Sequence, residues 1–173
     1  LARRRLPRFI FDFVDGGAGS EITLRENEEA LGRVRFAPRA QTDVSRRSTA
    51  TTVLGEQLAL PVMLAPTGLQ RLVHPGADPA AARAATSVGS NYVVSSASAF
   101  SVEDVARAAE RPLWFQLYLW RDRATVEHVV ERARKAGCST LVVTVDVPLV
   151  GRRERDLRNG MTLPPRLTLR NVY

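Results

Sequence analysis

The chain has 173 residues, of which 45% are hydrophobic and 25% are charged. This is the composition of a globular protein, and the length suffices for one domain with a hydrophobic core. Its apolar runs are far too short for a membrane-spanning helix, and we expect no secretory signal because no apolar segment follows the basic start. The single cysteine, Cys138, excludes a disulfide within the chain.

The formal net charge of +7 favours an anionic partner. The basic residues are dispersed among acidic ones and do not alternate with aromatic residues, so a small anionic ligand is a better explanation than nucleic acid. We expect a cytoplasmic protein, and docking to an anionic membrane surface stays open as an alternative.

In chain order, the sequence first predicts a helix over residues 20–31 and a small hairpin over residues 49–60 that turns at Gly55 and Glu56. Four β-type runs follow, with helical patterns between them. The runs are 60–65, 92–96, 113–117 and 140–145, and the helices are 78–88, 101–109 and 122–136. The alternation of strand and helix is typical of right-handed βαβ units in a parallel sheet.

Two of these helices have clear start signals. Asp122 is a good N-cap for the helix that ends before Gly137, and its apolar residues follow helical spacing. Ser101 and Asp104 form a weak variant of the capping box at the start of the preceding helix.

The last strand leads directly into a charged segment. Residues 141–145 are almost continuously apolar and rich in β-branched side chains, as in a strand that is covered on both faces. Asp146 ends this run, and an arginine-rich loop that contains Arg152 and Arg153 follows. Because ligands bind at the carboxyl ends of parallel strands, this edge is expected to hold an anion.

Every predicted strand brings polar groups to this same edge. In chain order these are Pro66, Thr67 and Gly68, then Ser95 and Ser96, then Gln116 and Tyr118, and then Thr144 and Asp146. A glycine lets the backbone approach a ligand closely, and neutral donors and acceptors suit the edge of a flat heterocycle. An arginine such as Arg153 binds a carboxylate bidentately. The chain has no glycine-rich phosphate fingerprint, so a nicotinamide site is not supported.

Structural interpretations of these groups stay open. The segment 66–68 could be a simple turn, Asp146 could cap one, and the arginines could lie in a solvated loop. Two isolated histidines, His74 and His128, with one distant cysteine do not make a metal site, so we predict no metal.

Five ordered motifs resemble one enzyme family over almost the whole chain. They are LPRFIFDFVDGGAGSE at 6–21, LPVMLAPTGLQ at 60–70, VVSSASAFSVEDVA at 93–106, WFQLYLWRDR at 114–123 and TVDVPLVGRRERDLRN at 144–159. They are similar to the FMN-dependent 2-hydroxy acid oxidases and dehydrogenases, which include glycolate oxidase and L-lactate dehydrogenase. Within this family the chain is most similar to the (S)-mandelate dehydrogenase group.

The resemblance implies a cofactor and a reaction. The cofactor is FMN, and an L-2-hydroxy acid similar to mandelate or lactate would be oxidised to the 2-keto acid. The flavin contacts would be made by Pro66, Thr67, Gly68, Ser95, Gln116 and Thr144. Tyr118 would contact the substrate as a catalytic residue, Asp146 would support a catalytic histidine, and Arg153 would bind the substrate carboxylate.

Two positions depart from the pattern of the family. Phe13 stands where the family usually has a substrate-binding tyrosine, so one carboxylate contact is lost and the substrate range is expected to differ. Gly68 stands where the oxidases commonly have alanine, which favours a dehydrogenase that reacts poorly with oxygen.

The resemblance also implies an incomplete barrel. A TIM barrel needs about 250 residues, and the catalytic lysine, histidine and arginine of the family lie in its second half. We therefore predict the N-terminal half of a (β/α)8 TIM barrel, with a cap segment at 1–59 and four β/α units at 60–173. Its partners would be the C-terminal half of the barrel, oxygen or a quinone as electron acceptor, and further copies in a homotetramer.

By itself, this chain is expected to be inactive. Two alternatives remain: a non-catalytic FMN-binding half-barrel that requires a partner chain, and another TIM-barrel enzyme that acts on a phosphorylated substrate.

Overall fold

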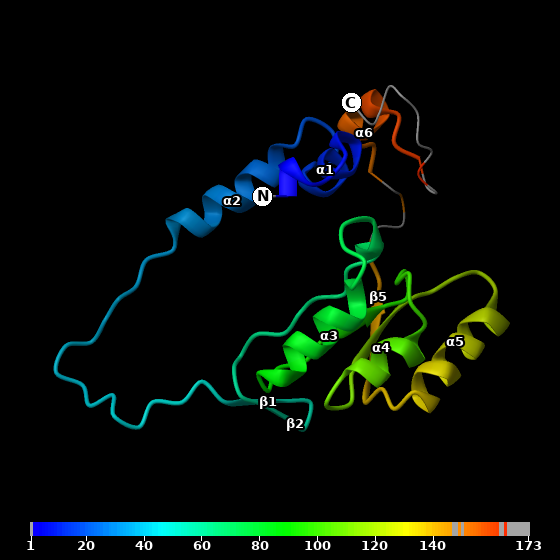
Figure 1. Cartoon of the computed structure of the whole chain (residues 1–173). Helices are drawn as coiled ribbons and strands as arrows, with labels where there is room; N and C mark the ends of the chain where they lie inside the picture. The colour runs from blue at the N-terminus through cyan, green and yellow to red at the C-terminus, as the bar shows by residue number, and fades with distance from the viewer. Residues whose placement is uncertain (1, 147–148, 150, 163–164, 166–173) are drawn as a thin grey trace. The chain divides into compact units, whose positions relative to one another are not determined.

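The structure is a computed structural model that describes residues 2–146, 149, 151–162 and 165. The chain forms two compact units, one made of Leu1–Asp43 with Val147–Tyr173 and the other of Val44–Asp146. Figure 1 shows the elements of both. The predicted boundary between a cap at 1–59 and barrel units at 60–173 stays a prediction.

A parallel sheet is the centre of the unit Val44–Asp146. It contains β3 (Val93–Ser95), β4 (Trp114–Tyr118) and β5 (Thr140–Thr144) in that order, and all neighbouring strands are parallel. This confirms three of the four predicted strands.

The fourth predicted strand, at 60–65, is reduced to one parallel bridge between Leu64 and Tyr92. Two features of this segment explain the difference. Pro61 has no N–H to donate, and the carbonyl of Val62 accepts from the Ser90 hydroxyl instead of from a strand.

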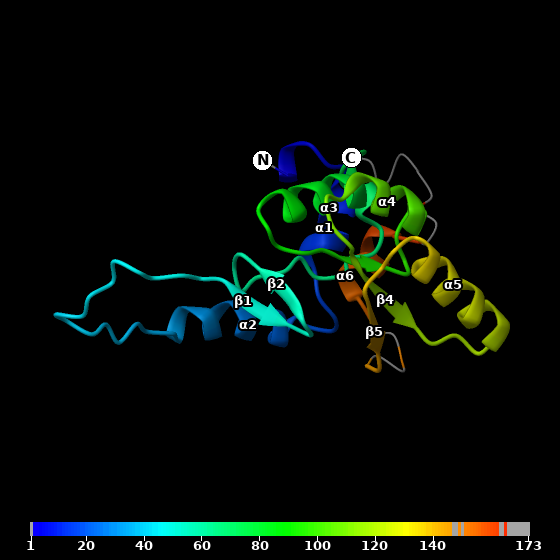
Figure 2. The same ribbon diagram turned by 90° about the horizontal axis from the view of Figure 1, so that it is seen from below.

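Three helices cover one face of the sheet (Figure 2). The hydrophobic core lies between them and the strands. They are α3 (Ala77–Ser87), α4 (Val102–Ala108) and α5 (Arg123–Lys135), close to the predicted positions. Both predicted N-caps are confirmed: the Ser101 side chain accepts from the Asp104 N–H, and Asp122 accepts from Ala124. Alternate strand residues, including Val94, Phe115 and Leu117, point into this core.

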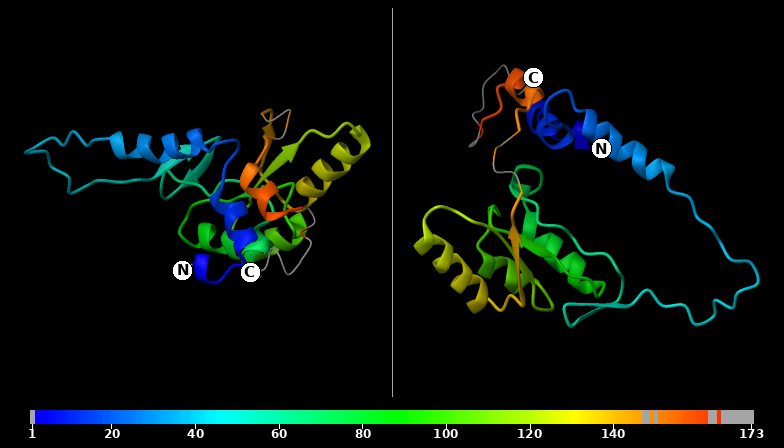
Figure 3. Two further views of the ribbon diagram at one scale, coloured as in Figure 1. Left: turned by 90° about the horizontal axis from the view of Figure 1, so that it is seen from above. Right: turned by 180° about the vertical axis from the view of Figure 1, so that it is seen from behind.

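The predicted hairpin is also present, as β1 (Thr51–Val53) and β2 (Glu56–Leu58). The carboxylate of Glu56 ties it to the sheet unit, because it accepts from the indole of Trp114 at 2.7 Å and from the amide of Asn91 at 2.7 Å. Arg111 completes the cluster with an ion pair of 2.9 Å to Glu56. The long connection at 34–50, which leads to this hairpin, contains neither helix nor strand (Figure 3).

The other unit is helical. It contains η1 (Ala2–Arg4), α1 (Arg8–Asp15), the predicted α2 (Ile22–Arg33) and α6 (Glu154–Asn159). The arginine-rich segment predicted as a loop therefore includes a short helix. Its formation is explained by acidic residues in the first turn, by contacts with α1 and by Gly160, which ends it in the left-handed conformation.

Within the described part of the chain, no helix combines the length and the apolar character that crossing a membrane requires.

Candidate functional site

Three of the predicted flavin-binding side chains form a hydrogen-bonded line across the three parallel strands. The Ser95 hydroxyl donates to Gln116 Oε1 at 3.1 Å, and Gln116 Nε2 donates to Thr144 Oγ1 at 2.7 Å. The strand register produces this arrangement. Ser95 is the register partner of Gln116, and Thr144 on β5 lies two residues beyond Val142, the other register partner of Gln116. The structure thus brings Ser95, Gln116 and Thr144 together at the carboxyl end of the sheet.

Gln116 is the centre of this line, and only 2% of it is exposed. Its oxygen also accepts from the Ser96 N–H at 3.2 Å, so the amide is held in one orientation. The Thr144 hydroxyl proton and the second hydrogen of the Gln116 amide remain for a ligand. A fixed row of neutral donors fits the polar edge of an isoalloxazine ring.

The loop at 66–69 approaches a neighbouring loop closely. A Cβ atom added to Gly68 would lie 2.9 Å from the Cβ of Ala97, so a larger residue at position 68 needs a backbone shift. The next residue, Leu69, adopts the left-handed conformation (φ 59°), and its N–H donates to the Ala97 carbonyl. The predicted contact residues Pro66 and Thr67 are exposed, as a ligand contact requires.

The two predicted catalytic side chains also lie at this edge of the sheet. Tyr118 is the last residue of β4, is 44% exposed and lies opposite Thr144 in the register. Asp146 follows β5 by two residues and is exposed. Neither side chain forms a hydrogen bond with another described residue, so both are available to a substrate or to a residue outside the described chain.

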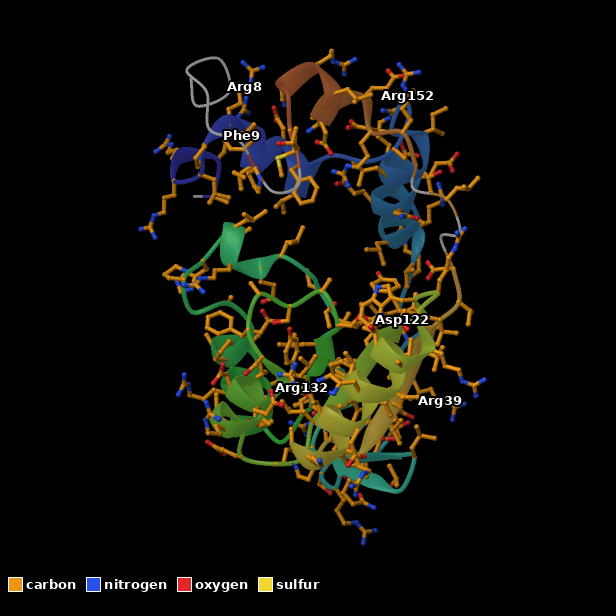
Figure 4. The ribbon with its side chains drawn as sticks, turned by 90° about the vertical axis from the view of Figure 1, so that its right-hand side faces the viewer. Arg8, Phe9, Arg39, Asp122, Arg132 and Arg152 are labelled. Carbon is orange, nitrogen blue, oxygen red and sulfur yellow. The ribbon has the colours of Figure 1, made fainter. Side chains whose placement is uncertain are left out.

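In the helical unit, the structure brings Arg153 and Phe13 together. The guanidinium of Arg153 lies over the ring of Phe13, 4.9 Å from its centroid, and donates to the carbonyl oxygens of Phe13 and Gly16. Its Nε pairs with Asp156, which leaves Nη1 without a partner among the described residues. Arg153 is therefore held by the protein and retains one free edge, whereas its neighbour Arg152 is exposed (Figure 4).

Arg155, in α6, connects this helix to α1 and to the glycine-rich segment after it. It pairs with Glu21 at 2.6 Å and with Asp15 at 2.9 Å. The N–H of Gly17 and the guanidinium of Arg155 lower the pKa of Glu21, so the pair stays charged at neutral pH. Sequence reasoning did not assign a role to Arg155. Its acidic partners are remote in the chain, so no local pattern of residues could have revealed these contacts.

Sequence reasoning also missed three linked side chains behind the loop at 66–69: Gln70, Asp78 and Tyr92. Burial, reinforced by Asp78, raises the pKa of Tyr92, so its hydroxyl remains protonated. The available signal was Tyr92 itself, because a tyrosine at the start of a buried strand needs a hydrogen-bond partner.

Comparison with known proteins identifies the family. The model of the FMN-dependent dehydrogenases matches residues 2–173. The chain belongs to this family. Its fold is accordingly an α/β half of a TIM barrel, and FMN is the cofactor of the family.

Individual relatives agree with this assignment. The chain is 45% identical to glycolate oxidase 5 of Oryza sativa subsp. japonica and 42% identical to glycolate oxidase of Spinacia oleracea, in each case over 99% of this chain and 46% of the relative. A crystal structure of mandelate oxidase superposes with a TM-score of 0.88 at 43% identity, covering 99% of this chain and 48% of the other. The chain thus spans about half the length of the relatives it matches.

Proposed function

We propose that this chain carries the flavin-binding half of an enzyme that oxidises an L-2-hydroxy acid to the 2-keto acid. The observation that supports the proposal most directly is the line of Ser95, Gln116 and Thr144 across three strand ends. FMN, when bound, accepts the two electrons that the substrate loses. The donors of this line and the backbone at 66–68 would hold the ring.

The substrate-binding roles extend this proposal. Nη1 of Arg153 would donate to the substrate carboxylate, since Nε and Nη2 of this guanidinium already donate to Asp156, Phe13 and Gly16. The Tyr118 hydroxyl would donate a hydrogen bond to the substrate. Asp146 would stabilise the protonated form of a catalytic histidine. With Phe13 in place of a tyrosine, the carboxylate would have one hydrogen-bond donor fewer.

Substrates similar to mandelate or lactate are proposed, with a dehydrogenase preferred over an oxidase. The preference for a dehydrogenase rests on Gly68. The relatives named above are oxidases, so the electron acceptor needs an assay of its own.

The test is an anaerobic titration of the intact protein that contains this chain with a panel of 2-hydroxy acids. We expect a yellow protein whose visible flavin absorbance is bleached by the L-enantiomer of mandelate or lactate and not by the D-enantiomer. A protein that binds no flavin, or whose bound flavin no 2-hydroxy acid bleaches, contradicts the proposal. Reoxidation by oxygen compared with a quinone then separates oxidase from dehydrogenase.

A non-catalytic FMN-binding half-barrel is the second candidate, favoured by the coverage of about half of each relative. Residues 1–173 alone are proposed to be inactive. Both candidates share this expectation, and it is tested by whether purified residues 1–173, mixed with FMN and a 2-hydroxy acid without any other chain, reduce the flavin. Reduction under these conditions would show that the half-barrel is sufficient.

A further inference from the structure

Three side chains form a hydrogen-bonded relay behind the loop at 66–69. Tyr92 donates its hydroxyl proton to Asp78 Oδ1 at 2.8 Å. Gln70 Nε2 donates to Tyr92 Oη at 2.8 Å and to the Thr67 carbonyl at 3.2 Å. The relay therefore runs from the first turn of α3, through the start of β3, to the backbone of the loop.

The direction of every hydrogen bond in the relay is fixed. An amide nitrogen only donates, so Tyr92 Oη must accept from Gln70 and pass its own proton toward Asp78. Both hydrogens of Gln70 Nε2 are thereby used. Asp78 is fully buried and Tyr92 is 1% exposed, so water cannot replace a lost partner.

Strained backbone lies at both ends of the relay. Leu69 follows the loop with φ of 59°, and Ala77 precedes Asp78 with φ of 31°. Residues other than glycine rarely adopt these backbone conformations, which persist only where surrounding contacts hold them. The relay supplies such contacts, together with the hydrogen bond from the Leu69 N–H to the Ala97 carbonyl.

We propose that Asp78, Tyr92 and Gln70 are positioning residues that hold the backbone at 66–68 in the conformation that receives the flavin. This inference rests on the proposed function, because it assigns the relay to the flavin site. The relay is not proposed to touch the ring or the substrate. It acts through the Thr67 carbonyl, which it fixes from behind.

The test uses the variant Tyr92→Phe in the intact flavoprotein. Removal of the hydroxyl breaks the bond from Tyr92 to Asp78 and the bond from Gln70 to Tyr92, so Gln70 loses the partner that orients it toward the Thr67 carbonyl. We expect FMN to bind about threefold to tenfold more weakly, as for the loss of one hydrogen bond to the loop. The midpoint potential and the visible spectrum of the remaining flavin should shift as well.

Thr86→Val is the matched control. It removes another buried hydroxyl, which donates to the Ala82 carbonyl inside α3, accepts from the Glu110 N–H and forms no hydrogen bond with the loop at 66–69. We expect it to lower the thermal midpoint without changing FMN affinity or the flavin spectrum. If Tyr92→Phe leaves affinity and spectrum as unchanged as Thr86→Val does, the proposal is wrong.

A second variant tests the connection between the members. Gln70→Met removes both donors at similar side-chain volume, so the double variant with Tyr92→Phe should bind FMN no more weakly than Gln70→Met alone. If the losses of FMN affinity in the two single variants add up in the double variant, the three side chains do not act as one unit.

Failure of the proposed function gives a different result. In that case the wild-type protein binds no FMN at all. The relay is then tested by hydrogen exchange of the Leu69 amide, which Tyr92→Phe should accelerate and Thr86→Val should not. Equal exchange in the two variants would refute the relay independently of any flavin.

Discussion

At the scale of single residues, the Thr144 hydroxyl is held in place by one hydrogen bond and is proposed to receive a ligand. It accepts from Gln116, so its own proton is free to be donated. The threonine hydroxyl therefore has a defined direction before any ligand binds. Such preorganisation lowers the entropic cost of binding.

The variant Thr144→Val should weaken FMN binding about tenfold, because the Gln116 amide loses its acceptor and the ligand loses a donor. Thr144→Ser retains the hydroxyl and should change the affinity by no more than about twofold. Quenching of flavin fluorescence on titration with the intact protein measures both. Equal affinities of the two variants would argue against a flavin contact at this position.

Gly68 offers a second test at the residue scale. Gly68→Ala places a methyl group 2.9 Å from the Cβ of Ala97 and should lower the stability by about 1–3 kcal/mol, the usual cost of overpacking. Ala97→Gly removes the opposing methyl group and should restore most of that loss in the double variant. The thermal midpoints of the four proteins provide the comparison, and a double variant no more stable than Gly68→Ala would contradict the steric explanation.

At the scale of elements, α4 and α5 are joined by an ion pair at the surface. Arg132 of α5, which is labelled in Figure 4, donates to both carboxylate oxygens of Glu103 in α4, at 2.9 and 2.7 Å. The hydrogen bonds from Arg132 hold the pKa of Glu103 at about 2, below its ordinary value of 4.5. Both side chains are more than a third exposed, so solvent screens much of this interaction.

The pH dependence of stability follows from this lowered pKa. Because the folded state binds a proton at Glu103 less readily than the unfolded state, the contribution is complete above about pH 4.5 and is lost as the pH falls through about 2. Glu103→Gln should therefore lower the free energy of unfolding by about 0.5 kcal/mol at pH 7. The difference from wild type should shrink toward pH 2.

Urea titrations at several pH values test this expectation. Glu127→Gln is the control. Glu127 pairs with Arg123 within α5, the helix of Arg132, and both side chains of this pair are far more exposed. This variant should leave the stability unchanged within error. A difference between Glu103→Gln and wild type that persists undiminished at pH 2 would exclude the ion pair as its cause.

At the scale of the whole molecule, β5 has an uncovered face. Its register partners on β4, Phe115 and Leu117, are buried beneath the helices. Leu141 and Val143 lie on the same face of the sheet but are each 43% exposed. An apolar strand face of this kind is stabilised when another element covers it, and we propose that the C-terminal half of the barrel would do so.

The variant Val143→Lys should therefore act differently in two contexts. In residues 1–173 alone the new charge stays in solvent, and the stability should change little. In the intact protein the lysine would be buried, and we expect a loss of about 2 kcal/mol or more. Chemical unfolding of both proteins tests this, and an equal effect in the two would mean that nothing covers β5.

The sequence by itself determined the order of the βα units, two helix caps and the polar strand ends. These features depend on local periodicity, on side chains within one helical turn, and on the need of a buried glutamine for partners. For this reason β3, β4 and β5 and the line through Gln116 were predictable. The family resemblance, carried by the same motifs, implied FMN.

Only the tertiary structure decided which distant side chains meet. Trp114 donates to Glu56 across 58 positions of the chain, and Arg153 reaches Phe13 across 140. It also reduced the strand at 60–65 to one bridge and formed α6 in a predicted loop. Such contacts depend on packing between segments remote in the chain, and no local pattern of residues encodes them.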